Sequence, residues 1–193
     1  MKVYLISDTH FNHDMIATYC HRPENFTEIL MKRWNETVTP NDLVIHLGDF
    51  LIGNKQRASE ILKNLHGQKV LVRGNHDESH SNTWWISQGF AFSCDAMEFR
   101  GCWLTHRPSC MLPPGSGCRV NIHGHLHNVW HGFAPSEFKP YLMSDSARLK
   151  HPWHRLFAVE YTDYRPVEFN KFLDHPDRYQ SRYRVDKELK RDI

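Results

Sequence analysis

Histidine and aspartate residues gather at a few short places along the chain, and the densest is NIHGHLHNVWHG at residues 121–132. His123, His125 and His127 follow one another at every second position of this stretch, and His131 comes four residues later. In extended backbone this spacing points the side chains to one face, so we expect His125 and His127 to share a face. Histidine is the commonest metal ligand, which leaves two interpretations of the stretch, a metal site or a polar surface.

Similar residues follow short apolar runs elsewhere in the chain. They lie in the motifs SDTH, GDF, GNHD and LTH, and they are Asp8, His10, Asp49, Asn75, His76, Asp77 and His106. Taken alone, Asp8 is more often a turn former or a helix cap, Asn75 could be a turn residue, and His106 is more often an ordinary partly buried histidine. Together they lie at the carboxyl ends of predicted strands, where open α/β folds place their sites, so we expect one shared site.

The types of these residues indicate which ions the site would take. The candidate ligands are carboxylate, imidazole and amide groups, and none is a thiolate, which suits Mn, Fe, Zn, Co or Ni. The seven candidate ligands are Asp8, His10, Asp49, Asn75, His106, His125 and His127. Seven ligands are too many for one tetrahedral ion and fit two ions that share a bridging carboxylate, for which we choose Asp49.

The elements that must position these residues alternate in type over the first half of the chain. The runs VYLIS, LVIHL and KVLVR read as strands buried on both faces. Residues 25–38 predict a helix with Asn25 as its N-cap and Phe26, Ile29, Leu30 and Trp34 on one face. Residues 55–67 predict a second helix that stops at a glycine, Gly67.

After residue 90 the pattern changes to strands with no clear helix between them. Residues 92–106 predict two strands joined at Arg100-Gly101, and residues 119–125 and 154–169 predict further strands. Residues 111–117 read as a loop, and the polar tail from Lys171 reads as a surface helix or a frayed end. We therefore expect an α/β fold, two packed mixed sheets flanked by helices, in a single domain over residues 1–193.

Composition excludes several classes of protein. The chain has 193 residues, 40% of them hydrophobic, and a formal net charge of +2, so no strong field indicates nucleic acid or a membrane as partner. No apolar run approaches the roughly 18 residues of a membrane helix, and the first residues do not form a secretory signal. Five cysteines without CxxC spacing argue against a disulfide framework, so we expect a cytoplasmic protein.

In their order along the chain, the blocks SDTH, GDF, GNHD, THRP and GHLH resemble the signature of the calcineurin-like metallophosphoesterases, especially the small single-domain bacterial and phage members. The resemblance implies a four-layer sandwich of two β-sheets between helices. It also implies a dinuclear centre of divalent ions, with Mn as first choice and Fe, Zn, Ni or Co as alternatives. The implied reaction is hydrolysis of phosphoesters, in our interpretation of phosphodiesters, by attack of a metal-bridging hydroxide.

The resemblance also implies a role for each site residue. Asp8, His10, Asp49 and His127 would hold one ion, and Asp49, Asn75, His106 and His125 the other. His76 would be the catalytic histidine, with Asp77 as its orienting partner. Arg107 stands where this subgroup leads us to expect Tyr, and its guanidinium is a candidate phosphate clamp.

Three other interpretations stay open at this point. The chain could bind metal without catalysis, or it could be a phosphomonoesterase acting on nucleotides or phosphoproteins. It could also bind nucleic acid through the tail DRYQSRYRVDKELKR, although acidic residues there offset the basic ones. We expect a nucleotide or a small phosphodiester as the phosphoester substrate and no membrane partner, while residues 133–155 carry no motif that we recognise.

Overall fold

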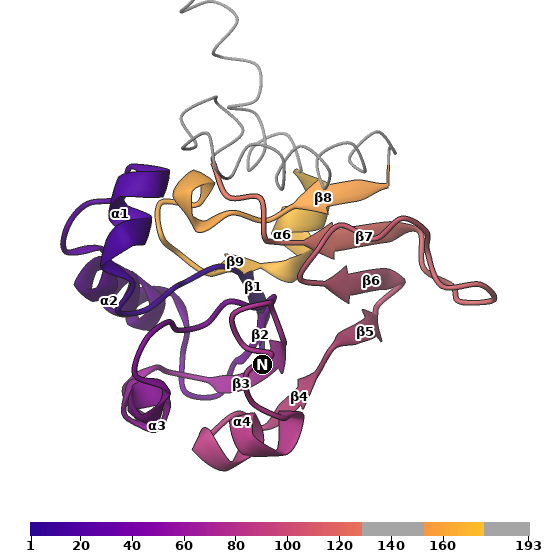
Figure 1. Cartoon of the computed structure of the whole chain (residues 1–193). Coiled ribbons are helices and arrows are strands. Elements are labelled where there is room, and N and C mark those ends of the chain that lie inside the picture. Colours follow the sequence, from indigo (N-terminus) through magenta and orange to yellow (C-terminus); the bar gives the residue numbers. More distant parts are fainter. Residues whose placement is uncertain (129–152, 176–193) are drawn as a thin grey trace, which may run out of the picture.

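Two mixed β-sheets form the centre of the molecule (Figure 1). The computed structural model describes residues 1–128 and 153–175. In these ranges the first sheet has the order β4-β3-β2-β1-β9, with β4 at Phe92–Cys94, β3 at Gln68–Val72, β2 at Leu43–His46, β1 at Val3–Ile6 and β9 at Val167–Glu168. Strands β1 to β4 are parallel, and β9 runs antiparallel to β1 at the edge.

The second sheet is built from the later part of the chain. Its order is β5-β6-β7-β8, with β5 at Ala96–Phe99, β6 at Cys102–Thr105, β7 at Val120–His123 and β8 at His154–Leu156. β5 and β6 form an antiparallel hairpin, whereas β6, β7 and β8 are parallel. The hairpin turns at Arg100-Gly101, where both residues have positive φ, as a tight hairpin turn requires. The predicted turn is therefore confirmed.

Short helices lie between the strands and after the last of them. They are α1 (Asp14–Cys20), α2 (Phe26–Thr37), the 3-10 turn η1 (Lys55–Arg57), α3 (Ala58–Asn64), α4 (Asn82–Gln88), the 3-10 turn η4 (Val159–Tyr161) and α6 (Phe169–Asp174). Figure 1 shows α1, α2 and α3 on the side of the first sheet that faces away from the second sheet. Within the described ranges, none of the helices is long and apolar enough to cross a membrane. Two mixed sheets with flanking helices confirm the predicted α/β class.

One hydrophobic core extends through both sheets. All four residues of β1 are buried, as the sequence predicted for a strand covered on both faces. Helix α2 buries Phe26, Leu30 and Trp34 as expected, while Ile29 is only half-buried. Asn25 occupies the N-cap position of α2, but its side chain makes no capping hydrogen bond. Packing of the apolar face therefore stabilises α2 more than its cap does.

The structure corrects the predicted end of the second helix. Helix α3 ends at Asn64, and Gly67 lies in the turn that leads into β3 with φ +83°. A Cβ at Gly67 would lie 2.9 Å from both the Asp42 carbonyl oxygen and Val38 Cγ1, so the turn needs a glycine for close approach as well as for its φ. Gly67 does occupy a turn that requires glycine, but this turn precedes β3 and does not end the helix.

The later half also departs from the prediction. Residues 92–106 form three strands and not two, because β4 joins the first sheet before the chain crosses to the β5–β6 hairpin. Residues 154–169 form two short strands in different sheets, with η4 between them. The polar tail begins later than Lys171, since α6 continues to Asp174 and fully buries Phe172. The rest of the tail, His131 and most of residues 133–155 lie outside the described residues.

Asp42 fixes the start of β2 through three hydrogen bonds. Its carboxylate accepts from the Lys2 amide at 2.7 Å, the Thr39 hydroxyl at 2.7 Å and the Thr39 amide at 3.0 Å. These bonds, that of Lys2 first, lower the pKa of Asp42 from 3.8 to about 2. A carboxyl whose pKa is lower in the folded state stabilises the fold above about pH 4, and this contribution is lost as the pH falls through about 2.

We therefore expect Asp42→Asn to lower the free energy of unfolding by about 1.5–3 kcal/mol at pH 7, the usual worth of hydrogen bonds to a charged group. At pH 2.5 the difference from the wild type should be much smaller. Urea unfolding at the two pH values measures it, with Glu24→Gln as the control because Glu24 is an exposed carboxylate. An equal deficit at both pH values would contradict a role for the charge.

Candidate metal centre

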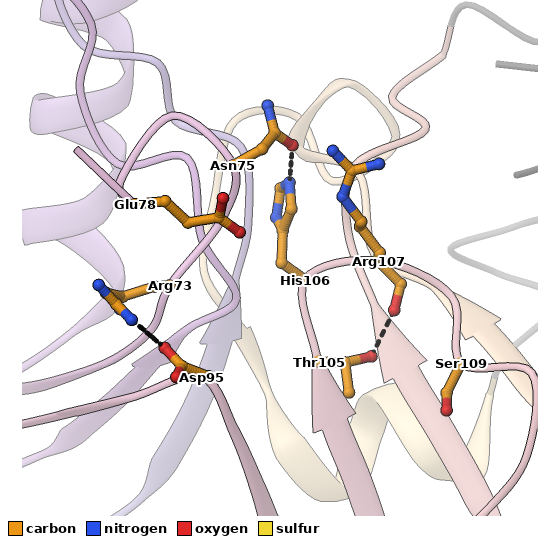
Figure 2. A pocket seen from close by; sticks show the side chains of 8 residues that line it. All are labelled: Arg73, Asn75, Glu78, Asp95, Thr105, His106, Arg107 and Ser109. Carbon is orange, nitrogen blue, oxygen red and sulfur yellow. Dashed lines mark hydrogen bonds and ion pairs between the residues drawn. The ribbon is translucent and has the colours of Figure 1, made fainter. Parts of the chain in front are cut away.

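The turns that follow β1, β2, β3, β6 and β7 bring the predicted site residues together. Among the described residues, three groups of predicted site residues have ligand atoms within 4.8 Å of one another and could hold a metal ion. They are Asp8 with His10 and His127, His10 with Asp49 and His76, and Asp49 with His106 and His125. Asn75 joins the last of these, because its Oδ1 lies 3.0 Å from His106 Nε2 (Figure 2). The structure therefore gathers all seven candidate ligands.

The first cluster lies between the turns after β1 and β7. His10 Nε2 and His127 Nε2 are 3.1 Å apart, and His127 Nε2 is 3.5 Å from Asp8 Oδ1. His10 Nε2 is also 3.5 Å from Asp49 Oδ2, and all four side chains are nearly or fully buried. Two imidazole nitrogens and two carboxylates that face one another away from water form a donor set suited to a divalent cation.

The second cluster shares Asp49 with the first. His106 Nε2 is 3.3 Å from Asp49 Oδ2, the same oxygen that faces His10, and 3.2 Å from His125 Nδ1. His106 Nδ1 is 2.8 Å from the Leu47 carbonyl oxygen, which keeps the Nε2 side of the ring directed at the cluster. The residues present fit two ions with one carboxylate between them.

The backbone that carries these ligands differs from the prediction. We expected extended backbone to place Asp8 and His10 on one face, and likewise His125 and His127. Both pairs lie beyond the ends of β1 and β7, in turns with φ of 54° at Asp8, 47° at His10, 73° at His125 and 48° at His127. Asp49 has φ 56°. Left-handed backbone at residues other than glycine costs about 1–3 kcal/mol each and persists only where the surroundings enforce it.

Asp8 is held by the turn of the opposite sheet. The His125 amide donates to Asp8 Oδ2 at 3.0 Å and to Oδ1 at 3.2 Å. This approach requires Gly124, because a Cβ there would overlap Ser7 Oγ and Asp8 Oδ2. Gly124, the glycine of GHLH, is therefore needed because any side chain there would displace the Asp8 carboxylate.

Asp49 is held in the same way by the turn after β3. The His76 amide donates to Asp49 Oδ1 at 2.9 Å, and a Cβ at Gly74 would overlap that oxygen. The buried carboxylate of Asp77 accepts hydrogen bonds from the amides of Asp49 at 2.7 Å, Gly74 at 2.9 Å and Phe50 at 3.2 Å. Asp77 thus holds the turn of Asp49 against its own turn, and these contacts differ from the expected orienting contact with the His76 ring.

Burial and neighbouring charges set the protonation states of the cluster. Burial lowers the pKa of His10 well below its usual value and lowers that of His125 to about 2. Burial alone would lower the pKa of His106, but the Asp49 carboxylate raises it to about 9. Burial alone would raise the pKa of Asp49, but His106, followed by His10 and His76, lowers it well below the usual value. At pH 7, His10 and His125 are therefore neutral and Asp49 is ionised, the forms that bind metal. His106 and His127, whose pKa values are raised, would release a proton when an ion binds.

His76 differs from the residues around it because its side chain is 47% exposed. Its Nε2 lies 3.9 Å from Asp49 Oδ2, at the rim of the clusters. The carbonyl oxygen of His76 accepts a hydrogen bond from Lys55 Nζ at 2.8 Å, and Lys55 lies over the Trp85 ring at 5.4 Å. An exposed imidazole beside a buried ligand cluster is placed to meet a bound molecule.

Sequence reasoning missed three charged residues that contact the site, namely Arg22, Lys55 and Glu160. Arg22 Nη2 lies 3.4 Å from His127 Nδ1, and Glu160 Oε1 lies 3.2 Å from the same atom. For Glu160 there was a signal, a lone charge inside the apolar run LFAVEY, since an unpaired charge is seldom buried. Arg22 and Lys55 lie in polar stretches, where nothing in the sequence distinguishes them from surface residues.

A pocket of about 220 Å³ adjoins the second cluster (Figure 2). It is lined by Arg73, Asn75, Glu78, Asp95, Thr105, His106, Arg107 and Ser109. Figure 2 shows the Arg107 guanidinium beside His106 at the level of Asn75, while Arg73 is paired with Asp95. The pocket therefore lies directly beside Asn75 and His106, two candidate ligands of the second cluster.

Two mixed sheets with clustered Asp and His residues at their strand ends are the arrangement expected of a metallophosphoesterase. Residues 1–189 match the calcineurin-like phosphoesterase family (Metallophos), and the chain belongs to that family. The resemblance inferred from the five motifs is thus confirmed. The family is one of metal-dependent phosphoesterases, and the buried Asp and His clusters are typical of its dimetal sites.

Two relatives illustrate the breadth of this similarity. Over 137 residues the chain is 46% identical to Uncharacterized protein MJ1445 of Methanocaldococcus jannaschii, covering 65% of this chain and 69% of that protein. A crystal structure of AQ665, a protein of unknown function from Aquifex aeolicus, is 25% identical with a TM-score of 0.62. That match covers 90% of this chain and 98% of the other.

Asp49→Asn tests whether one carboxylate serves both clusters. The substitution keeps the size of the side chain and removes the charge that two cations would share, so we expect bound Mn²⁺ to fall from two ions per chain to one or none. Elemental analysis after equilibrium dialysis measures the stoichiometry, and circular dichroism checks the fold. Asp14→Asn, at an exposed position of α1, should keep both ions. Two ions retained in Asp49→Asn at wild-type affinity would refute the shared role.

Proposed function

We propose that the protein is a dinuclear metal-dependent phosphoesterase that prefers phosphodiesters. The observation that carries the proposal is the position of Asp49 Oδ2, which faces His10 Nε2 at 3.5 Å and His106 Nε2 at 3.3 Å. One carboxylate oxygen between two buried ligand clusters is what a pair of ions needs in order to be held close together. Membership of the phosphoesterase family supports the reaction type.

The ligands divide between two ions in this proposal. Asp8, His10, Asp49 and His127 would hold one, and Asp49, Asn75, His106 and His125 the other. When bound, two divalent ions supply Lewis acidity that activates a water molecule near neutral pH and offsets charge on the phosphoryl oxygens. We choose Mn²⁺ as the first ion to test, because a mixed set of carboxylate, imidazole and amide ligands suits it.

His76 acts on the leaving group in this proposal. It is consecutive with Asn75, its ring is half-exposed, and its backbone is fixed by Asp49 and Lys55. A ring held in this way can donate a proton to the departing oxygen while the neighbouring ligands stay in place. Asp77 contributes indirectly, because its three backbone contacts keep the turn of Asp49 beside that of His76.

The pocket beside His106 supports the preference for diesters. A diester carries a second alcohol group that needs room next to the phosphorus, and about 220 Å³ of polar-lined space adjoins the second cluster. Arg107 in its lining can pair with a non-bridging phosphate oxygen through its guanidinium. Thr105 and Ser109 line the same pocket, with their hydroxyl groups donating to the carbonyl oxygens of Arg107 and Met111.

The proposal is tested with metal-stripped protein and a generic diester. We expect no turnover of bis(p-nitrophenyl) phosphate without metal, restored turnover with Mn²⁺, and a lower kcat/KM for the monoester p-nitrophenyl phosphate. Asp49→Asn purified in parallel controls for contaminating phosphatases. Full activity in excess EDTA, or no hydrolysis of either ester by protein that holds two ions, would refute the proposed function.

His76→Ala separates proton transfer from metal binding. We expect the variant to keep both ions and to hydrolyse alkyl diesters roughly 10²–10⁴-fold more slowly, the usual worth of general acid catalysis. Nitrophenyl diesters should lose less, because nitrophenolate departs without a proton. Rates across esters of increasing leaving-group pKa, together with metal content, measure the effect.

His80→Ala is the matched control for this series, since His80 lies four residues away and stacks on Trp84 with ring centroids 3.8 Å apart. It should leave the rates unchanged. An equal loss for all esters in His76→Ala would reject the general-acid role, and loss of metal would make His76 a ligand.

A further inference from the structure

Glu160 is a buried acid outside the five motifs. It lies in η4, on the segment that leads from β8 to β9, and its side chain is 3% exposed. Its Oε1 lies 3.2 Å from His127 Nδ1 and accepts hydrogen bonds from Arg22 Nε at 3.0 Å and Arg22 Nη2 at 2.7 Å. One carboxylate oxygen therefore contacts both a candidate ligand and a guanidinium.

Arg22 holds Glu160 in place from the other side. Its side chain is fully buried, just beyond the end of α1, and its guanidinium carbon lies 5.2 Å from the centre of the Phe26 ring. Besides Glu160, it donates to the carbonyl oxygens of Asp8 at 2.7 Å and Thr9 at 2.9 Å. Arg22 thus joins η4 to the turn that carries the first cluster's ligands.

The two ring nitrogens of His127 face different partners. Nδ1 faces Glu160, while Nε2 faces His10 Nε2 at 3.1 Å and Asp8 Oδ1 at 3.5 Å. A hydrogen bond from Nδ1–H to a carboxylate leaves Nε2 as the atom that binds a cation and fixes the orientation of the ring.

We infer that Glu160, anchored by Arg22, is a positioning residue that orients His127 toward the ion of the first cluster. The inference rests on the proposed function, because it takes His127 as a metal ligand. It assigns a role to the β8–β9 connection, which none of the sequence motifs covers.

Another use of these residues is a further metal site, since Cys20, His127 and Glu160 offer ligand atoms within 4.8 Å of one another. The position of Arg22 argues against it. Its guanidinium contacts Glu160 Oε1 through two nitrogens and approaches His127 Nδ1 to 3.4 Å, so a cation there would meet a permanent positive charge. Glu160 is therefore assigned to support His127 and not to bind an ion itself.

The test is calorimetric titration of metal-stripped protein with Co²⁺, in parallel with the absorption spectrum of the bound ion. Wild-type protein should bind two ions. In Glu160→Gln we expect one of the two to bind about 10–100-fold more weakly, the usual cost of losing such a partner, with the other unchanged. The Co²⁺ spectrum of the weakened site should change as well, since the ring of His127 loses its fixed orientation.

Two further variants control for the fold. Glu160→Asp keeps a negative charge opposite Arg22 and withdraws the carboxylate from His127 by one methylene. It should therefore weaken the binding of the same ion. If Glu160→Gln does not fold, this variant alone tests whether Glu160 positions His127. Asp163→Asn removes the exposed ion pair with Arg33, three residues further along the same segment. It should leave both ions unchanged, and urea unfolding verifies that each variant is folded.

The outcomes separate this inference from the proposed function. If wild-type protein binds two ions and both folded Glu160 variants bind them equally well, the positioning role is refuted and the dinuclear site stands. If both sites weaken together, Glu160 stabilises the whole domain and has no specific relation to His127. If wild-type protein binds no ion, the proposed function and this inference both fail.

Discussion

The burial of the Asp8 and Asp49 carboxylates is the constraint on which the rest of the structure depends. They follow β1 and β2, neighbouring parallel strands, and both are nearly inaccessible to water. A carboxylate removed from water is costly unless it is paired or hydrogen-bonded. Asp8 accepts from the His125 amide in the other sheet, and Asp49 accepts from the His76 amide beside it. The turns that carry His125 and His76 must therefore come within hydrogen-bond distance of the two carboxylates.

That approach explains the unusual backbone of the site. Gly74 and Gly124 are needed because a Cβ at either would overlap a carboxylate oxygen, and five ligand-bearing residues are held in left-handed conformations. Such strain persists only when packing nearby enforces it, and the site lies directly beyond strands whose residues are almost all buried. The fully buried carboxylate of Asp77, with its three amide partners, adds a polar clamp to that packing. Packing and hydrogen bonds are thus densest around the turns whose left-handed backbone they must hold in place.

The sequence predicted which residues meet but not how the backbone brings them together. Apolar runs that end in Asp, Asn or His located the strand ends, because strand burial and turn chemistry are both local properties. The expectation that alternation in a strand aligns Asp8 with His10 was wrong, since the turns adopt a conformation that only tertiary contacts enforce. The contact between Arg22 and Glu160 spans 138 positions, so no local pattern could reveal it. The same holds for two of the three amide partners of Asp77, which lie in the turn after β2.

Both clusters draw ligands from both sheets, and this has a consequence for folding. Each ion would join turns of the first sheet to a turn of the second, as Asp8 and His10 meet His127 and as Asp49 meets His106. Ions that bind only the assembled site stabilise the folded state by mass action, so metal and sheet packing are coupled. The β8–β9 connection crosses between the same two sheets, and the Arg22–Glu160 pair fixes it to the turn after β1. A protein contact that needs no metal therefore joins the two sheets on the side of His127, and it would hold the first cluster in place before an ion binds.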